Sequence, residues 1–345
     1  MDHSAADRRW MKRALMLARR QAGATWPNPT VGCCIVRDGE LLAEAVHAGP
    51  GQPHAEAAAL LALAAHRIDP AGSTAYVSLE PCHHEGRTAA CSRALADAGV
   101  ARVVYGAADD TPRHPGGGGA WLATQGVEVT AGVCGDLARE LVHPFLETSS
   151  DEEAHVTLKL ALTADGKLAR RPGRIEDAAD RAVTGDRVQR RVHRMRAGAG
   201  AVIVGAGTAR ADRPRLDVRL LDASAWSGQP PLPVVLAGHD SLDPGDLPES
   251  ALVLGNGHAD WDSVLAELVR RGRGIVMVEG GARIAADLLA ACPPHRIHLY
   301  LAGRGFGPEG VRLPGGVSLA DRYETMRVRP LGADVEWVLR RRDLG

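Results

Sequence analysis

The chain has 345 residues, a length that favours two domains, and its 45% hydrophobic and 24% charged residues are ordinary for a globular protein. With 41 Lys and Arg against 42 Asp and Glu, the net charge of -1 excludes the overall basic excess that attracts polynucleotides. The N-terminus lacks the pattern of a signal peptide, and no apolar run approaches the roughly 18 residues of a membrane span. Six scattered cysteines fit a reducing compartment. We therefore expect a soluble cytoplasmic protein that binds neither nucleic acid nor membrane.

The first half of the sequence predicts alternating helices and strands. Apolar residues at helical spacing indicate a helix over residues 4–20, and two prolines hold residues 26–30 extended before a buried strand. Alternating elements of this kind predict a largely parallel sheet between helices. The predicted strands cover residues 31–36, 41–47, 73–79, 102–106 and 127–130, and the further helices cover 54–65, 89–98, 119–125 and 136–146.

Three residues of the first half have the pattern of a catalytic zinc site. His54 lies in the first turn of one predicted helix, Cys82 follows a predicted strand, and Cys91 lies in the first turn of the next helix. One imidazole and two thiolates leave the fourth position of a tetrahedral zinc ion to water, and Glu56 could reach that water without binding the metal. H-x-E followed by P-C and a second cysteine is typical of zinc deaminases that act on nucleobases. Here the two cysteines are nine positions apart instead of three.

Taken singly, each of these residues also has an ordinary structural interpretation. An isolated histidine or cysteine is usually a packed structural residue, and only the combination favours zinc. Asn28, held between two prolines, could present a rigid amide to a base or could be a turn residue that binds its own backbone. The purely structural interpretation is kept for the other cysteines, Cys33, Cys34, Cys134 and Cys292.

A polar, acidic segment at residues 147–153 separates the halves, so we place the domains at residues 1–147 and 154–345. Two glycine-containing turns in the second half, at 205–212 and 279–283, could bring backbone amides to the phosphates of a dinucleotide. Ten Lys and Arg against four Asp and Glu at residues 167–196 suit an anionic ligand, with a solvated helix face as the alternative. The strands predicted in this half cover 155–162, 199–204, 232–237, 252–254, 275–278, 295–301 and 335–339.

With both halves in view, the chain resembles the bifunctional deaminase/reductase family of riboflavin biosynthesis over residues 10–339. The nine-position step between the two cysteines is typical of this family. The similar motifs of the first half are Pro27-Asn28-Pro29, Pro53-His54-Ala55-Glu56, Glu80-Pro81-Cys82 and Arg87-Thr88 before Cys91. Those of the second half are Leu158-Lys159-Leu160-Ala161, Asp165-Gly166-Lys167, Val204-Gly205-Ala206-Gly207-Thr208 and Glu279-Gly280-Gly281.

The resemblance implies an α/β fold with a three-layer cytidine-deaminase-like domain and a dihydrofolate-reductase-like α/β domain. It also implies Zn²⁺ and NADPH as cofactors and a phosphoribosylated diaminopyrimidine as substrate. Zinc at His54, Cys82 and Cys91 would activate a water molecule, Glu56 would pass its proton to the departing amine, and NADPH would then reduce the ribosyl group to ribityl. By position in the family pattern, the cofactor-binding residues would be Ala161, Thr208, Asp212 and Gly281, and the substrate-binding residues Asn28, Arg87, Arg196, Leu216, Arg219 and Glu279.

Several positions depart from the family pattern. Ala89-Ala90 replaces two prolines, residues 171–183 lack a family tryptophan, and Arg213 replaces an aspartate. A deaminase whose reductase domain has lost hydride transfer is therefore an alternative, as is a related specialised-metabolite pathway. The near-zero charge and the long cysteine step disfavour a nucleic-acid base deaminase. A non-catalytic, zinc-stabilised binding module is disfavoured because Glu56, which binds no metal, would have no role in it. The oligomeric state, a homo-oligomer included, is left open.

Overall fold

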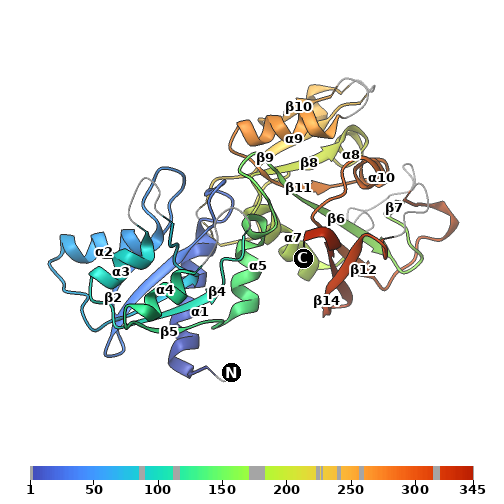
Figure 1. Cartoon of the computed structure of the whole chain (residues 1–345). Coiled ribbons are helices and arrows are strands. Elements are labelled where there is room, and N and C mark those ends of the chain that lie inside the picture. Colours follow the sequence, from blue (N-terminus) through green and yellow to red (C-terminus); the bar gives the residue numbers. More distant parts are fainter. Residues whose placement is uncertain are drawn as a thin grey trace. The chain divides into compact units, whose positions relative to one another are not determined.

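The computed structural model describes residues 3–84, 90–111, 117–170, 183–222, 226, 228–238, 242–255, 260–313 and 319–344. Arg87 and all of the segment at 171–183 except Val183 lie outside them. The chain divides into a first unit, Met1–Asp151 with Asp222–Gln229, and a second unit, Glu152–Leu221 with Pro230–Gly345 (Figure 1). Within the described residues, no helix is long and apolar enough to cross a membrane.

The first unit is a five-stranded sheet in the order β2-β1-β3-β4-β5, packed against helices. Strands β3, β4 and β5 are parallel, as the alternation of helices and strands predicted, whereas β1 pairs antiparallel with both of its neighbours. The β1–β2 hairpin reverses the chain, and the crossover through α2 returns β3 parallel to β2, on the other side of β1. The strands are Gly32–Arg37, Glu40–Val46, Thr74–Leu79, Arg102–Ala107 and Glu128–Thr130, and helices α1 to α5 are Ala5–Arg20, Ala55–Ala65, Cys91–Asp97, Gly118–Thr124 and Gly135–Leu146.

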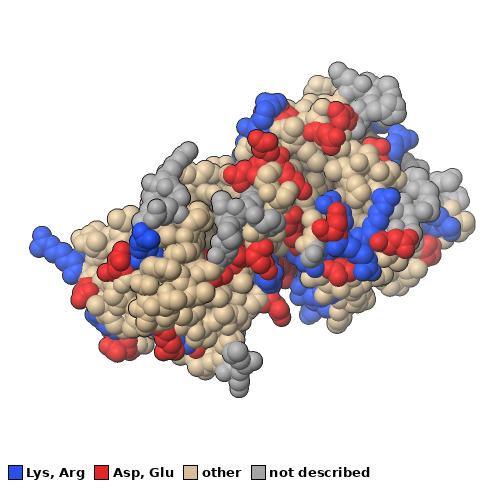
Figure 2. Space-filling model, viewed as in Figure 1, with Lys and Arg blue, Asp and Glu red and all other residues tan. Residues whose placement is uncertain are grey.

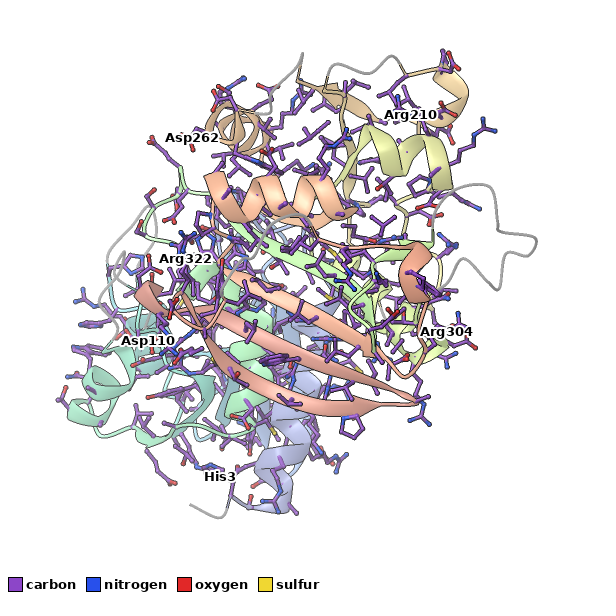
Figure 3. All side chains as sticks on the ribbon, turned by 90° about the vertical axis from the view of Figure 1, so that its right-hand side faces the viewer. His3, Asp110, Arg210, Asp262, Arg304 and Arg322 are labelled. Carbon is purple, nitrogen blue, oxygen red and sulfur yellow. The ribbon has the colours of Figure 1, made fainter. Side chains whose placement is uncertain are left out.

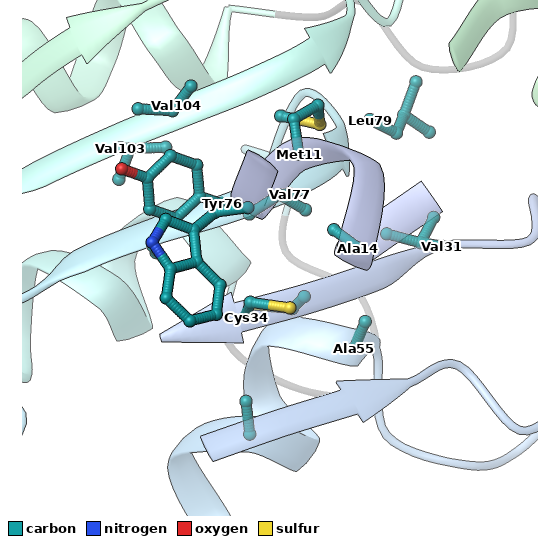
Figure 4. Packing of buried hydrophobic residues seen from close by; sticks show 14 of the residues in the cluster. Met11, Ala14, Val31, Cys34, Ala55, Tyr76, Val77, Leu79, Val103 and Val104 are labelled. Atoms are coloured by element: carbon teal, nitrogen blue, oxygen red, sulfur yellow. The ribbon is translucent and has the colours of Figure 1, made fainter. Parts of the chain in front are cut away.

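Helix α1 packs its apolar face on this sheet (Figure 4). The side chain of Ser4 caps the helix by accepting from the backbone N–H of Asp7 at 3.0 Å, and Met11 and Ala14 are fully buried. A Cβ atom on Gly32 would lie 2.2 Å from the backbone oxygen of Ala14, so only glycine lets helix and strand approach so closely. This close contact between α1 and Gly32 fixes the position of β1 under the helix.

The second unit contains an eight-stranded sheet in the order β10-β9-β8-β11-β6-β12-β15-β14. The strands from β10 to β12 are parallel, and β15 and β14 are antiparallel to their neighbours. Helix α9 and the edge strand β14 are elements that the sequence pattern did not predict. Strands β6 to β15 are His155–Thr163, Ala169–Arg170, Ala201–Gly205, Leu232–Leu236, Leu252–Leu254, Ile275–Glu279, Arg296–Ala302, Gly310–Val311, Tyr323–Leu331 and Asp334–Arg341, and helices α7 to α10 are Asp186–Ala197, Ala206–Asp212, Trp261–Arg270 and Ala282–Ala291.

Two clusters of apolar side chains bury this sheet. One joins α9 and α10 to the sheet, with Trp261 and Leu288 among its members, and Figure 3 shows α10 lying across the strands. The other joins α7 and α8 to the sheet through Val188, Val192 and Ala209. The basic segment therefore includes an amphipathic helix, α7. Because β6, β8 and β11 are parallel, their carboxyl ends share one edge of the sheet, where ligands commonly bind in α/β folds. The expected α/β architecture with two domains of different kinds is confirmed.

Candidate active sites

His54, Cys82 and Cys91 lie close together in the first unit. Their ligand atoms are all within 4.8 Å of one another, with Nδ1 of His54 3.7 Å from Sγ of Cys82 and 3.4 Å from Sγ of Cys91. In a tetrahedral zinc site, with Zn–S of about 2.3 Å and Zn–N of about 2.0 Å, nitrogen and sulfur ligands are about 3.6 Å apart. The donor atoms and their spacing therefore fit a zinc ion.

Local structure explains why these three residues meet. His54 is the N-cap of α2, Cys91 is the first residue of α3, and Cys82 follows the end of β3. The backbone N–H of Cys91 donates to Sγ of Cys82 at 3.4 Å, and that of Ser92 donates to the Cys82 carbonyl at 3.1 Å. Helix starts carry partial positive charge, which favours thiolate ligands. The two helix starts and the strand end meet as the sequence predicted.

Hydrogen bonds among the three ligands set their protonation. The hydrogen bond from Cys91, followed by that from His54, lowers the pKa of Cys82 to about 4. The same contact raises the pKa of Cys91, and the contact with Cys82 raises the pKa of His54. Cys82 is therefore the member of the cluster that ionises most readily and can bind a cation as thiolate. Binding a metal would release the remaining protons.

Glu56 lies in the first turn of α2 and is 3% exposed. Burial, followed by the nearby charge of Cys82, raises its pKa to about 7. A carboxyl group with such a pKa both accepts and releases a proton near neutral pH, as a general acid–base group must. No described residue binds Glu56 in an ion pair. This is the arrangement that the sequence predicted for a proton carrier beside the zinc ligands.

A pocket of about 100 Å³ opens beside these residues, lined by Asn28, His47, Glu80 and Asp109 among others. Nε2 of His47 lies 3.0 Å from Nδ2 of Asn28, and Nδ1 of His47 lies 3.0 Å from the carbonyl oxygen of Pro53. Since a carbonyl can only accept, His47 donates from Nδ1 and accepts the Asn28 amide at Nε2. Burial lowers the pKa of His47, in keeping with this neutral form. The Asn28 amide oxygen is left to accept from a ligand.

Sequence reasoning did not assign a role to His47 or Asp109. Asp109 lines the pocket, and burial raises the pKa of its carboxyl group to about 6. This carboxyl group therefore ionises closer to neutral pH than that of an ordinary aspartate. His47 ends a predicted strand and Asp109 follows another, and no spacing marks either residue. Their position at or after the end of a predicted strand was the one feature that could have marked them, and many ordinary loop residues share it.

Glu80, from the Glu-Pro-Cys motif, holds the wall of this pocket together. Its carboxylate accepts from the backbone N–H groups of Asp109 at 3.2 Å, Gly117 at 3.2 Å and Gly119 at 2.9 Å. A Cβ atom on Gly118 would lie 1.8 Å from the backbone oxygen of Pro81, so glycine is required where α4 begins. Glu80 thereby fixes the loop after β4 and the start of α4 next to Cys82.

In the second unit, Lys159, Arg196 and Glu279 form a cluster of charges, in which Arg196 is buried and the other two are partly buried. Arg196 donates from Nε to Oε1 of Glu279 at 2.5 Å and from Nη2 to Oε2 at 2.9 Å, and its Nη1 donates to the Asp217 carbonyl at 3.1 Å. Burial tends to raise the pKa of Glu279, but the contacts with Arg196 have the larger effect and lower it below its usual value. The pairing of β6 with β11 places Lys159 opposite Glu279, and burial lowers the pKa of Lys159. Sequence reasoning included Lys159 in a motif and assigned it no role.

The other residues expected in the second site differ in burial and in their contacts. A Cβ atom on Gly281, the N-cap of α10, would lie 3.0 Å from Oγ1 of Thr208, so these two candidates are neighbours. Ala161 follows Lys159 by two residues on β6 and shares its face. Asp212 is exposed at the end of α8. Leu216 is 1% exposed inside the core, so only its backbone could face a ligand.

Two arginines complete this description. The backbone N–H of Arg219 donates to Nδ1 of His193 at 3.1 Å, and its side chain pairs with Asp217. Arg213, which replaces a family aspartate, ends α8 in the left-handed conformation, and its Nε lies 3.0 Å from Oδ1 of Asp246. The arginine that replaces the family aspartate thus forms an ion pair with Asp246. Figure 2 shows positive and negative side chains interspersed over the visible face, as the near-zero net charge suggests.

Comparisons with known proteins give a match for each half of the chain. Residues 4–107 match the cytidine and deoxycytidylate deaminase zinc-binding region, and residues 154–336 match the RibD C-terminal domain. The riboflavin biosynthesis protein RibD of Escherichia coli is 32% identical over 95% of this chain and 98% of its own length. That of Aquifex aeolicus is 33% identical over 94% of each chain.

Solved structures agree over nearly the whole length. The diaminohydroxyphosphoribosylaminopyrimidine deaminase/5-amino-6-(5-phosphoribosylamino)uracil reductase of Thermotoga maritima is 29% identical, with a TM-score of 0.76 over 97% of this chain and 99% of its own. RibD of Acinetobacter baumannii is 31% identical, with a TM-score of 0.73 over the same shares. The resemblance noted from the motifs is thus confirmed. The chain belongs to the RibD family of riboflavin biosynthesis, and it is a bifunctional enzyme with a zinc-dependent deaminase domain and an NADPH-dependent reductase domain.

Proposed function

We propose that this enzyme deaminates a phosphoribosylated diaminopyrimidine in its first unit and reduces the ribosyl group of the product to ribityl in its second. The Thermotoga maritima relative is named for a deaminase and a reductase acting on such compounds. The observation that carries the proposal is the convergence of buried Glu56 with His54, Cys82 and Cys91 beside one pocket. The cytoplasmic location stays a prediction, which six free cysteines support.

In the deaminase unit, His54, Cys82 and Cys91 would hold zinc, which supplies Lewis acidity that activates water at neutral pH. Glu56 takes a proton from the attacking water and returns it to the amine as the C–N bond breaks. Its pKa of about 7 supports both directions of transfer.

The pocket side chains would select the pyrimidine. Asn28 is oriented by His47 so that its oxygen accepts from an N–H of the ring. Asp109 presents a carboxyl group to the amino groups of a diaminopyrimidine. Arg87 is kept as the predicted phosphate contact, although it lies outside the described residues.

In the reductase unit, NADPH supplies the hydride for the ribose carbon attached to the base. As the bond from that carbon to the ring oxygen opens, the oxygen must gain a proton. Lys159 is a partly buried cation with a lowered pKa beside Glu279, so it suits the transfer of that proton. Arg196 and Glu279 would hold the sugar, with Arg219 and the backbone of Leu216 beside them. Ala161, Thr208, Asp212 and Gly281 would bind the cofactor.

The decisive experiment incubates the pure protein with the phosphoribosylated diaminopyrimidine, with and without NADPH, and identifies the products by mass. We expect replacement of one amino group by a hydroxyl without NADPH, and the further gain of two hydrogen atoms with it. Deaminated product alone would restrict the enzyme to its first reaction. Unchanged substrate in both tubes would overturn the proposal. Released ammonia and oxidised NADPH provide independent readouts.

A further inference from the structure

The second unit contains a pocket that neither reaction, as derived above, uses. It has a volume of about 460 Å³ and is lined by Lys167, Pro308, Gly310, Val311 and Arg312. Two of these five residues are cationic and none is acidic. Its volume lies in the range of small-molecule sites, about 300–1,000 Å³.

Lys167 is the unusual member of this lining, because the residue is only 3% exposed. Lysine is almost never so buried without a partner, yet no hydrogen bond or ion pair joins its ammonium group to any described residue. The acidic residue closest in sequence, Asp165, is engaged elsewhere: its carboxylate accepts from Oγ1 of Thr163 and from the backbone N–H groups of Phe306 and Gly307. An unpaired buried charge is costly, and the described residues offer Lys167 no anion.

The position of Lys167 is built into the fold. Its backbone N–H donates to Oγ1 of Thr163 at 2.9 Å, and the Thr163 N–H donates to its carbonyl at 2.9 Å. A Cβ atom on Gly310 would lie 2.4 Å from Cγ of Lys167, so glycine is required for the lysine stem to pass. The stem is therefore fixed against the backbone of Gly310 next to the short strand β13, and the ammonium group belongs to the pocket.

We propose that this pocket binds a phosphate monoester, with Lys167 as the buried cation and the exposed Arg312 as a second cation in its lining. A group of charge near minus two matches these two side chains, and arginine binds phosphate oxygens through its planar fork. Lys167 itself lies just after the carboxyl end of β6, the strand that carries Lys159 and Ala161.

Two ligands of this enzyme carry such a group: NADPH at its 2′ position and, resting on the proposed function, the sugar phosphate of the substrate. Binding measurements on the whole enzyme separate these sources without any turnover. Calorimetry compares NADPH with NADH, and ribose 5-phosphate with ribose, because each pair differs in one phosphate. Failure of either reaction would leave these measurements intact, so the two proposals are tested separately.

The test variant is Lys167→Met, which keeps the stem and removes the charge. We expect the Kd of one phosphorylated probe to rise at least ten-fold while its unphosphorylated counterpart is unchanged. A response of NADPH identifies the cofactor phosphate, and a response of ribose 5-phosphate identifies the sugar phosphate. Arg312→Gln, at an exposed residue, should raise the same Kd about three-fold, since partly exposed charged contacts contribute less.

The matched control is Arg270→Gln, which removes an arginine 72% exposed on α9 and paired with Glu267. It should change no Kd. Unchanged binding of both phosphorylated probes to Lys167→Met would overturn the proposal. If that variant fails to fold, Lys167→Arg should retain binding, and unchanged binding of both probes to Arg312→Gln overturns it instead.

Discussion

Glu56, buried in the deaminase unit, and Glu279, partly buried in the reductase unit, have pKa values that move in opposite directions. Burial raises the pKa of Glu56 to about 7, with the charge of Cys82 adding to the effect. Burial acts on Glu279 as well, but the guanidinium of Arg196 binds both of its oxygens and lowers the pKa. A surrounding of low dielectric constant disfavours the ionised form of a carboxyl group, and a bound cation stabilises that form. The first glutamate is therefore suited to carry protons and the second to remain a fixed negative charge.

The largest expected effect is the loss of deamination in Glu56→Gln. The amide fills the same space and cannot accept the proton, so ammonia release should fall by about 10²–10⁴-fold, the usual contribution of a general acid–base group. Metal analysis should find zinc unchanged, because Glu56 is not one of the three ligands. Cys82→Ser is the contrasting control and should lose zinc and activity together. Normal ammonia release in Glu56→Gln would remove this residue from the reaction.

The second prediction removes the cation from Glu279. Arg196→Met should lower the free energy of unfolding by about 3–5 kcal/mol, since it leaves a buried charge without its main partner. Denaturant unfolding measures the loss. The double variant Arg196→Met with Glu279→Met should recover most of it, because no unpaired carboxylate remains. Equal losses in the single and double variants would show that packing, and not charge, explains the effect.

The third prediction concerns the pH dependence of stability. The pKa of Glu279 is lowered from 4.5, so its ionised form stabilises the folded state fully above pH 4.5, and this contribution is lost as pH falls through the lower folded pKa. The difference in unfolding free energy between the wild type and Glu279→Gln should therefore be largest near neutral pH and shrink in acid. Unfolding curves from pH 7 down to pH 3 test this. A difference that grows in acid would contradict the assigned direction.

The smallest expected effect is that of Glu80→Gln. The amide leaves one acceptor oxygen for three backbone N–H groups and adds a competing donor, so the wall of the pocket should loosen. We expect a loss of stability of about 1–3 kcal/mol and a higher KM for deamination, with zinc retained. Melting temperature, KM and metal content are the measurements. Loss of zinc would mean that Glu80 supports the ligands themselves more than the pocket wall.

The sequence by itself indicated the parts of the two sites that depend on local structure. His54 and Glu56 share one helical turn, and Cys82 and Cys91 follow a strand end and begin a helix, so spacing along the chain predicts their positions. The predicted strands in both units and the glycine turns after β8 and β11 were found for the same reason. Periodicity and turn chemistry act over a few residues, and they are visible without a fold.

Only the tertiary structure decided the contacts between distant segments. Three features depend on strand order and register: the antiparallel pairing of β1 with β3, the pairing of Lys159 with Glu279, and the position of His47 against Asn28. Lys167 reads as an ordinary turn residue in the sequence, and its burial depends on Gly310, which is far along the chain. The physical reason is that a charge acquires its pKa and its partner from the neighbours that folding brings to it. Residue spacing predicted which groups could do chemistry, and packing determined the charge that each of them carries.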